Sequence, residues 1–330
     1  MSLLDKVSLL ITPNAVKASK LYSVIPSNGA GDLTVVRNTT ATRVNTNGID
    51  ESVALNVARL NYDSVGGAPH ILMEGQRTNL LLNSATLATQ SITTTAAAHT
   101  LSFRGTGTVT LSGSFTGSLV GTGANNRVAF TFTPTAATLT VTINGSCTNG
   151  QIELGGFATS YIPTLASAVT RNADLISKSG ISDLINSEEG VLFLEMAAFS
   201  NDTSSRSIVI SNGSNSYIYI RFDSFANRVL CQFFINGVSA SSNLTHTLSD
   251  SSNFNKLAIV YSSSKFNLFA NGQSVSTSTP TLVNSANTYN KITFGTDGQA
   301  NTGNFAGKIK SCQIYKGALT DAELTNLTTI

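Results

Sequence analysis

The chain has 330 residues, of which 12% are charged and 41% are hydrophobic, and its formal net charge is +2. No basic stripe stands out among the 20 basic and 18 acidic residues, so the sequence predicts no nucleic-acid binding. The low charge excludes long charged helices, while many Ser, Thr, Asn and Gly residues favour short strands joined by polar turns. The apolar content suffices for a compact core, and the length suggests about two domains.

Residues 1–31 are expected to form an N-terminal anchoring segment that ends in the turn-forming cluster at 27–31. Its apolar run, Val7 to Ile11, is shorter than most signal-peptide cores and far too short to span a bilayer. We therefore expect no membrane insertion. Two possibilities remain open for the run: it docks on a partner chain, or it packs locally as a first strand.

Residues 32–83 are predicted to form a β-rich arm. Its short strand candidates are Leu33 to Arg37, Thr42 to Asn45, Arg59 to Tyr62 and His70 to Met73. These strands are too short and too polar to build a core alone. We therefore expect the arm to lie across another part of the protein.

Residues 84–165 are predicted to form a small β-sandwich, and their sequence shows no helical pattern. In Val128 to Phe132 and in Leu139 to Ile143, apolar residues alternate with Thr or Ala, which is typical of half-buried strands. Further strands are expected at Thr100 to Arg104, Thr108 to Ser112 and Gln151 to Leu154. Residues 166–189 are interpreted as a connector with one weakly helical stretch at 183–186.

Residues 190–330 carry the pattern of a second, larger antiparallel sandwich, which is predicted to be complete within this range. Asn-Gly pairs at 212–213, 236–237 and 271–272 lie between or beside its strands and tolerate the positive φ of tight hairpins. The predicted strands are Ser216 to Phe222, Arg228 to Ile235, Lys256 to Tyr261, Phe266 to Ala270 and Lys308 to Tyr315. The predicted fold is therefore all-β, with two antiparallel β-sandwiches.

The last segment, Ala318 to Ile330, changes to a helical pattern. Thr320 and Glu323 have the spacing of a capping box, and Leu319 and Leu324 occupy the positions of a hydrophobic staple. One short helix is therefore expected to close the fold.

The three cysteines, Cys147, Cys231 and Cys312, are far apart and odd in number, so they do not form a disulfide framework. Two of them lie within apolar strand patterns, which favours buried free thiols in a reducing compartment. We expect synthesis in a cytoplasm.

No catalytic residue is predicted. A glycosidase needs two carboxyl groups about 5 to 10 Å apart, which on a strand means acidic residues at alternate positions. Glu188 and Glu189 are adjacent, so a strand would point them to opposite faces, and Glu195 has no acidic residue two positions away. These residues are interpreted as solvated charges.

No metal or cofactor is predicted either. His70, His99 and His246 are isolated from one another and from Cys in the sequence. The loop from Asp297 to Asn304 offers oxygen ligands suited to calcium but lacks the EF-hand spacing, so it remains either a calcium loop or a simple polar turn.

The candidate ligand site is a face of one strand. Alternation in Tyr217 to Phe222 places Ile218, Ile220 and Phe222 inside, and Tyr217, Tyr219 and Arg221 in a row outside. This row can stack on sugar rings, form a protein interface, or pack against neighbouring strands. All three possibilities stay open.

Three parts of the sequence resemble known modules. The first, which resembles a module common in phage virion proteins, comprises Arg37 to Val44, Gly48 to Val53, Asn56 to Tyr62 and Glu74 to Leu81. The second is similar to the closing strand and exit of a carbohydrate-binding-module-like sandwich in the same proteins, and comprises Gln151 to Gly155 and Ala158 to Thr164. The third is similar to the end of laminin-G-like, concanavalin A-like lectin domains, and comprises Phe305 to Ile309, Gln313 to Tyr315 and Ala318 to Leu324. This third resemblance implies a concanavalin A-like jelly roll for residues 190–330.

This resemblance implies a non-enzymatic phage structural protein on the virion surface, as a head fibre, capsid decoration or tail appendage, made in the host bacterial cytoplasm. The expected partners are other virion proteins, through the N-terminal region, and host-surface glycans. The apolar opening run and the meagre arm suggest self-association, with a homotrimer expected. The alternatives are a carbohydrate-binding adhesin or accessory module, and a depolymerase whose carboxylates come from distant strands.

Overall fold

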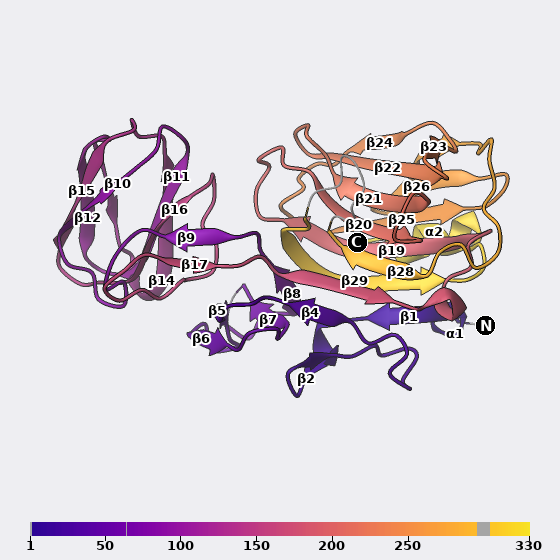
Figure 1. Cartoon of the computed structure of the whole chain (residues 1–330), viewed down its shortest axis with the longest axis horizontal. Coiled ribbons are helices and arrows are strands. Elements are labelled where there is room, and N and C mark those ends of the chain that lie inside the picture. Colours follow the sequence, from indigo (N-terminus) through magenta and orange to yellow (C-terminus); the bar gives the residue numbers. More distant parts are fainter. Residues whose placement is uncertain (1, 64, 296–303) are drawn as a thin grey trace.

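The computed structural model describes residues 2–63, 65–295 and 304–330. It confirms an all-β fold with two antiparallel β-sandwiches of unequal size (Figure 1). The smaller sandwich lies at one end of the long axis and the larger one at the other, with short two-stranded ribbons between and beside them.

The larger sandwich consists of two eight-stranded sheets. The first has the order β27 (Gln273–Ser278), β26 (Phe266–Ala270), β25 (Asn255–Tyr261), β19 (Gly190–Ala198), β29 (Gly307–Tyr315), β8 (Pro69–Met73) and β7 (Arg59–Tyr62), with β1 (Val7–Ile11) paired to β29. The second has the order β23 (Val238–Ser239), β22 (Arg228–Ile235), β21 (Tyr217–Phe222), β20 (Arg206–Ser211), β28 (Lys291–Phe294), β18 (Leu175–Ser179) and β4 (Thr34–Val36), with β24 (Leu244–Thr247) paired to β22.

The smaller sandwich packs a four-stranded sheet on a three-stranded one. Their orders are β10 (Gln90–Thr93), β15 (Thr138–Asn144), β12 (Thr108–Gly113), β13 (Gly117–Val120), and β14 (Gly123–Phe132), β11 (His99–Gly105), β16 (Cys147–Leu154). Its core contains Leu101, Phe103, Val109, Val141 and Ile152, all fully buried. The alternation predicted for this segment thus produces a one-sided core.

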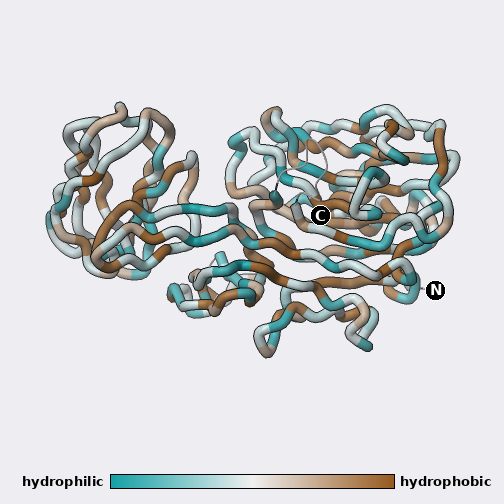
Figure 2. Tube along the Cα trace, in the orientation of Figure 1, coloured by the Kyte–Doolittle hydropathy of each residue, from teal (hydrophilic) through white to brown (hydrophobic). Residues whose placement is uncertain are grey.

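Three ribbons and four short helical segments complete the part of the chain that the structure describes. The ribbons are β2 (Val16–Lys17) with β3 (Lys20–Leu21), β5 (Ala41–Val44) with β6 (Asp50–Val53), and β9 (Arg77–Asn79) with β17 (Val169–Arg171). The helices are α1 (Leu3–Lys6) and α2 (Asp321–Thr328), and the 3-10 turns are η1 (Pro13–Ala15) and η2 (Ser182–Leu184). Figure 2 shows hydrophilic residues along the β9–β17 ribbon, which connects the two sandwiches.

The larger sandwich is not complete within residues 190–330, contrary to the prediction from its sequence pattern. Strand β1 lies along β29, and β7 and β8 extend the same sheet, while β4 and β18 extend the other sheet. The sheets therefore run across the boundaries expected at residues 31, 83 and 189.

The apolar opening run packs within the chain itself. Leu9 and Ile11 are fully buried, and they belong to the main core between the two large sheets. Of the two possibilities for this run, local packing is the one observed. The strands of the arm also belong to the large sheets. The apolar opening run and the short arm strands had suggested self-association, but both are accounted for within one chain.

The turns and strand faces follow the local sequence. Asn236 and Gly237 have φ of 51° and 80°, and Asn271 and Gly272 have 48° and 85°, so both pairs form the predicted tight hairpins. In β21, Ile218 and Ile220 are fully buried in the core between the sheets, as the alternation predicted.

Helix α2 begins as the sequence predicted. The Thr320 hydroxyl accepts a hydrogen bond from the Glu323 amide, and the Glu323 carboxylate accepts one from the Thr320 amide. Leu319 and Leu324 are buried together on the outer side of the first large sheet. None of the helices among the described residues is long and apolar enough to cross a membrane.

Thr320→Ala is expected to lower the free energy of unfolding by about 1 kcal/mol, because it removes the side-chain acceptor at the helix N-terminus. Urea unfolding monitored by circular dichroism measures this loss. Thr325→Ala, at an exposed position inside the same helix, is the control and is expected to be neutral or slightly stabilising. Equal stability of the wild type and the Thr320→Ala variant would contradict the prediction.

Candidate functional site

The predicted aromatic row lies on the outer face of the second large sheet. Tyr217, Tyr219 and Arg221 alternate along β21 with the core residues, and strands β20 and β22 flank them. The sequence therefore assigned the face of each residue correctly.

The row lies on the outer face of the sheet but is shielded from solvent. Tyr217, Tyr219 and Arg221 are 6%, 0% and 9% exposed. The Tyr217 ring stacks on Phe234 at 4.9 Å and on Tyr219 at 6.0 Å between centroids. The Tyr219 hydroxyl donates a hydrogen bond to the Gln232 side chain. Of the three possibilities for this row, cross-strand packing is the one these contacts display.

Arg221 is held within the same face. Its Nη2 lies 3.0 Å from the Asp223 Oδ1, and its guanidinium lies 5.3 Å from the centre of the Tyr219 ring. Burial raises the pKa of the Tyr219 hydroxyl, so this group stays protonated and acts as a hydrogen-bond donor. The row is thus a rigid aromatic layer with a cation at one end.

The histidines and the acidic residues considered for catalysis lie in separate parts of the described structure. His70 lies in β8, His99 in β11 and His246 in β24, which belong to three different sheets. Burial lowers the pKa of His70 to about 4, so its imidazole is neutral near pH 7. Glu188 and Glu189 are exposed in the turn before β19.

The remaining candidates are the metal-ligating side chains and the three thiols. No group of three His, Cys, Asp or Glu residues among them could hold a metal ion. Of the calcium candidate from Asp297 to Asn304, only Asn304, which is exposed, belongs to the described residues. Cys147, Cys231 and Cys312 are buried free thiols, as predicted, and burial raises the pKa of each, which keeps them protonated and unreactive.

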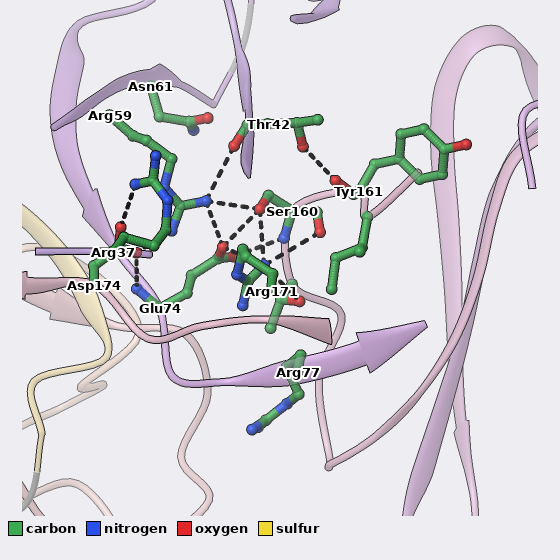
Figure 3. A network of polar contacts seen from close by, with 12 residues as sticks. Arg37, Thr42, Arg59, Asn61, Glu74, Arg77, Ser160, Tyr161, Arg171 and Asp174 are labelled. Atoms are coloured by element: carbon green, nitrogen blue, oxygen red, sulfur yellow. Dashed lines mark hydrogen bonds and ion pairs between the residues drawn. The ribbon is translucent and has the colours of Figure 1, made fainter. Parts of the chain in front are cut away.

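The most unusual polar feature is a cluster of charges that sequence reasoning did not single out. We call it the junction, defined by Arg37, Arg59, Arg77, Arg104, Arg127, Arg171, Asp50, Glu74, Glu153 and Asp174. It lies where the arm, the exit of the smaller sandwich and the edge of the larger sandwich meet, and Figure 3 shows its central part. Arg37, Arg59, Glu74, Arg171 and Asp174 are each at most 2% exposed.

Two carboxylates organise the centre of the junction. Asp174 accepts from Arg37 Nη1 at 2.7 Å and also from Arg59 Nη2. Glu74 pairs with Arg59 Nη1 at 2.6 Å and with Arg171 Nη1 at 2.8 Å. The Glu74 amide donates to Asp174 at 2.8 Å, so the two carboxylates and three guanidinium groups form one network.

The smaller sandwich joins this network through its exit segment. The Ser160 amide and hydroxyl donate to the Glu74 carboxylate at 2.7 and 2.6 Å, and Thr42 of the arm donates to the Tyr161 carbonyl at 2.5 Å. On the other side, Arg104 of β11 makes a two-pronged contact with Asp50 of β6 at 2.9 and 3.1 Å. The two sandwiches are therefore linked by buried, geometrically specific contacts rather than by a flexible tether.

An aromatic contact reinforces this link. Phe157, in the exit of the smaller sandwich, stacks on Phe199, which follows β19, with ring centroids 5.3 Å apart. The guanidinium groups of Arg77 and Arg206 lie 5.3 and 6.0 Å from the centre of the Phe157 ring. Cation–π contacts of this kind add to the fixed relative position of the sandwiches.

The charge state of Glu74, one of the two central carboxylates, does not suit catalysis of glycoside hydrolysis. Burial would raise the pKa of Glu74, but the charges of Arg171 and Arg59 and the hydrogen bonds from Ser160 outweigh it and lower the pKa to about 2. A glycosidase general acid needs the opposite shift, because it must carry a proton near neutral pH. Glu74 and Asp174 are close together, yet their chemistry is that of structural ion pairs.

The comparisons with known proteins concern the larger sandwich. Residues 196–325, less than half of the chain, match the family model of the concanavalin A-like lectin/glucanases superfamily, a laminin-G-type model. No curated protein matches the sequence.

Three solved structures are similar at a TM-score of 0.37. The CBM40 module of the Ruminococcus gnavus IT-sialidase, bound to α2,3-sialyllactose, is 20% identical over 43% of this chain and 83% of its own. The NanB sialidase of Streptococcus pneumoniae is 16% identical over 46% and 26%, and the leech intramolecular trans-sialidase is 19% identical over 44% and 24%. The family match and the paired sheets show that the larger sandwich has a concanavalin A-like, laminin-G-like fold.

Proposed function

We propose that this protein is a bacteriophage virion structural protein, displayed on the particle as a head fibre, capsid decoration or tail appendage, and that it contacts host-surface glycans. The observation that carries the proposal is the lectin-type domain held by a buried junction to a second sandwich. A fixed pair of sandwiches suits a protein whose task is to present surfaces.

The resemblance to phage virion modules supports the same proposal. The first stretch contributes Arg37, Arg59 and Glu74 to the junction, and the second contributes Ser160 and Tyr161, which bond to Glu74 and Thr42. The motif residues therefore have a physical role in this protein, since they join the arm to both sandwiches. We propose that this joint is the shared feature of the module and that it serves assembly rather than catalysis.

Self-association as a homotrimer and attachment to other virion proteins through the N-terminal region are part of the proposal. Edge strand β4 and its neighbour β18 expose Val36 and Leu175, which are paired across the two strands and are 41% and 43% exposed. An apolar pair at a sheet edge suits contact with another chain. Light scattering of the purified chain tests this part, and a monomeric mass would exclude the trimer.

Glycan contact is tested through the aromatic row. Tyr217→Ala and Tyr219→Ala are expected to reduce adsorption of virions to the host indirectly, because the outer face of the second large sheet loses the buried rings that support it. Phe225→Ala, which removes a 58% exposed ring outside the row, is the control. Thermal unfolding of each variant confirms the fold, and unchanged adsorption by folded variants would remove the row from the proposal.

The second candidate is a carbohydrate-binding adhesin or accessory module, which the lectin-type domain favours. A glycan array with the purified chain separates the two functions. Selective binding at millimolar affinity or better, without labelling of virions by an antibody to this chain, would favour the adhesin. Labelling of the particle surface would favour the virion protein.

A further inference from the structure

A second surface, away from the lectin domain, has the features of a ligand site. A cavity of about 660 Å³ lies between the arm and the smaller sandwich. Its walls include Asn61 and Tyr62 from the arm, and Arg104, Asn125, Asn126 and Arg127 from β11 and β14. The cavity therefore combines one aromatic ring, three amides and two guanidinium groups.

The junction behind this cavity carries an excess of positive charge. It contains six arginines and four carboxylates, all named above. Buried charges are costly unless they are paired, so an excess of two cations calls for a compensating anion. The position of the least compensated arginine shows where such an anion would bind.

That arginine is Arg127. Its Nη1 donates to the Thr159 carbonyl at 2.5 Å and its Nη2 to the Ser102 hydroxyl at 2.7 Å, and both acceptors are neutral. Its Nε is buried and has no hydrogen-bond partner. None of the described carboxylates lies within ion-pair distance of it. By contrast, Arg104 on the same wall is neutralised by Asp50 at 2.9 Å.

The negative charge that lines the cavity does not neutralise Arg127. Asp63 is part of the wall, but both of its carboxylate oxygens lie 2.9 Å from Lys308 Nζ. The pair Asp63–Lys308 is therefore internally balanced. Glu153, Asp50 and Glu74 act on Arg127 only from beyond ion-pair distance, so its guanidinium is the charge of the cavity wall that has no directly paired carboxylate.

We propose that this cavity binds an acidic saccharide, with its carboxylate or sulfate on Arg127. A guanidinium has five N–H donors, of which Arg127 uses one for Thr159 and one for Ser102, so further N–H groups on Nη1 and Nη2 remain to meet the oxygens of such a group. The half-buried Tyr62 offers a ring face for the sugar, and the exposed amides of Asn125 and Asn126 offer donors and acceptors for its hydroxyls. The site lies outside the lectin-type domain, so it goes beyond the glycan contact proposed for that domain.

The test is isothermal titration calorimetry of the full chain with sodium glucuronate, glucose and sodium sulfate as probes. Glucuronate is expected to bind, glucose at least tenfold more weakly, and added salt to weaken glucuronate binding. Binding of sulfate as tight as that of glucuronate would identify a simple anion site and overturn the saccharide assignment. Equal binding of glucuronate and glucose, or no binding of either charged probe, would overturn the proposal entirely.

Variants locate the site. Arg127→Gln is expected to abolish glucuronate binding, whereas Arg43→Gln, which removes the same charge from a surface pair with Glu51, is expected to leave it unchanged. Asn126→Ala changes only an exposed side chain and is expected to weaken binding severalfold, so it serves if Arg127→Gln does not fold. Full binding by folded Arg127→Gln or by Asn126→Ala would contradict the assignment. Loss of adsorption in the Tyr217 and Tyr219 variants is independent of these results.

Discussion

Asp174→Ala is expected to lower the free energy of unfolding by about 3 to 5 kcal/mol. Asp174 is 2% exposed and holds both Arg37 and Arg59, which are 1% and 0% exposed. Removing the carboxylate leaves two guanidinium groups close together without their shared counter-ion, and neither can reach water. Urea unfolding at neutral pH measures the loss.

The control for this prediction is an exposed ion pair. Lys265 and Asp321 are paired at the surface, with side chains 34% and 67% exposed, so Lys265→Ala is expected to cost less than about 1 kcal/mol. A loss for Asp174→Ala no larger than that for Lys265→Ala would show that the junction contributes little. Asp174→Asn keeps the shape of the side chain. Its loss in free energy of unfolding is expected to lie between those of Asp174→Ala and Lys265→Ala, because its amide oxygen still accepts a hydrogen bond from one arginine.

The junction also decides how the two sandwiches move relative to each other. Contacts between domains in one chain usually permit relative motion, because such interfaces are small and polar. Here the arm residue Arg59 contacts Glu74, Asp174 and Ser160 at once, and these come from three separate segments of the chain. A bending motion would have to break several buried charge contacts together, so we expect the two sandwiches to behave as one body.

Local patterns predicted the strands and turns of this protein well. Arg59 to Tyr62, Arg228 to Ile235 and Phe266 to Ala270 begin and end as the alternation indicated. The reason is that side-chain alternation and Asn-Gly turn chemistry act over two to eight residues, which a single sequence displays directly. The capping box of α2 belongs to the same class of local signal.

Strand partners could not be predicted, because they depend on contacts between distant segments. Strand β1 pairs with β29 and β4 with β18, and nothing in the five residues from Val7 to Ile11 specifies which strand edge they will meet. The larger sandwich therefore appeared complete in the sequence when it lacks several of its strands. The strands of the arm appeared too short and too polar to build a core for the same reason, because the strands that they pair with lie in other parts of the chain.

The burial of the aromatic row was also beyond a periodicity argument. Alternation separates two faces of a strand, but it does not say whether the second face is covered. Stacking covers the rings of Tyr217, Tyr219 and Phe234, and the sequence pattern of a single strand does not reveal such contacts.

A composition signal for the junction was present in the sequence and was missed. Residues 21–177 contain seven arginines and no lysine, while all ten lysines lie outside this range. Arginine suits buried pairs because its charge is permanent and its five donors are fixed in a plane, whereas lysine prefers a hydrated surface. Six of those seven arginines belong to the junction, so the bias itself marked a buried ionic cluster.

Acid is expected to destabilise the protein strongly through Glu74. The pKa of Glu74 is lowered from 4.5 to about 2, so its contribution is fully present above pH 4.5 and is lost as the pH falls toward 2. A shift of this size corresponds to a loss of about 3 kcal/mol from one buried group. Urea unfolding at steps from about pH 6 down to about pH 2 measures it.

The Glu74→Gln variant isolates this group from the other acids. It is expected to be less stable than the wild type at pH 6, because Arg59 and Arg171 lose a shared counter-ion. Between pH 4.5 and 2, its free energy of unfolding is expected to fall by about 3 kcal/mol less than that of the wild type, because it has no proton to take up at this position. Glu188→Gln, at an exposed glutamate, is the control and keeps the wild-type slope. Parallel curves for the wild type and Glu74→Gln would mean that the arginines do not hold Glu74 ionised, and the junction would then be a set of hydrogen bonds rather than an ionic network.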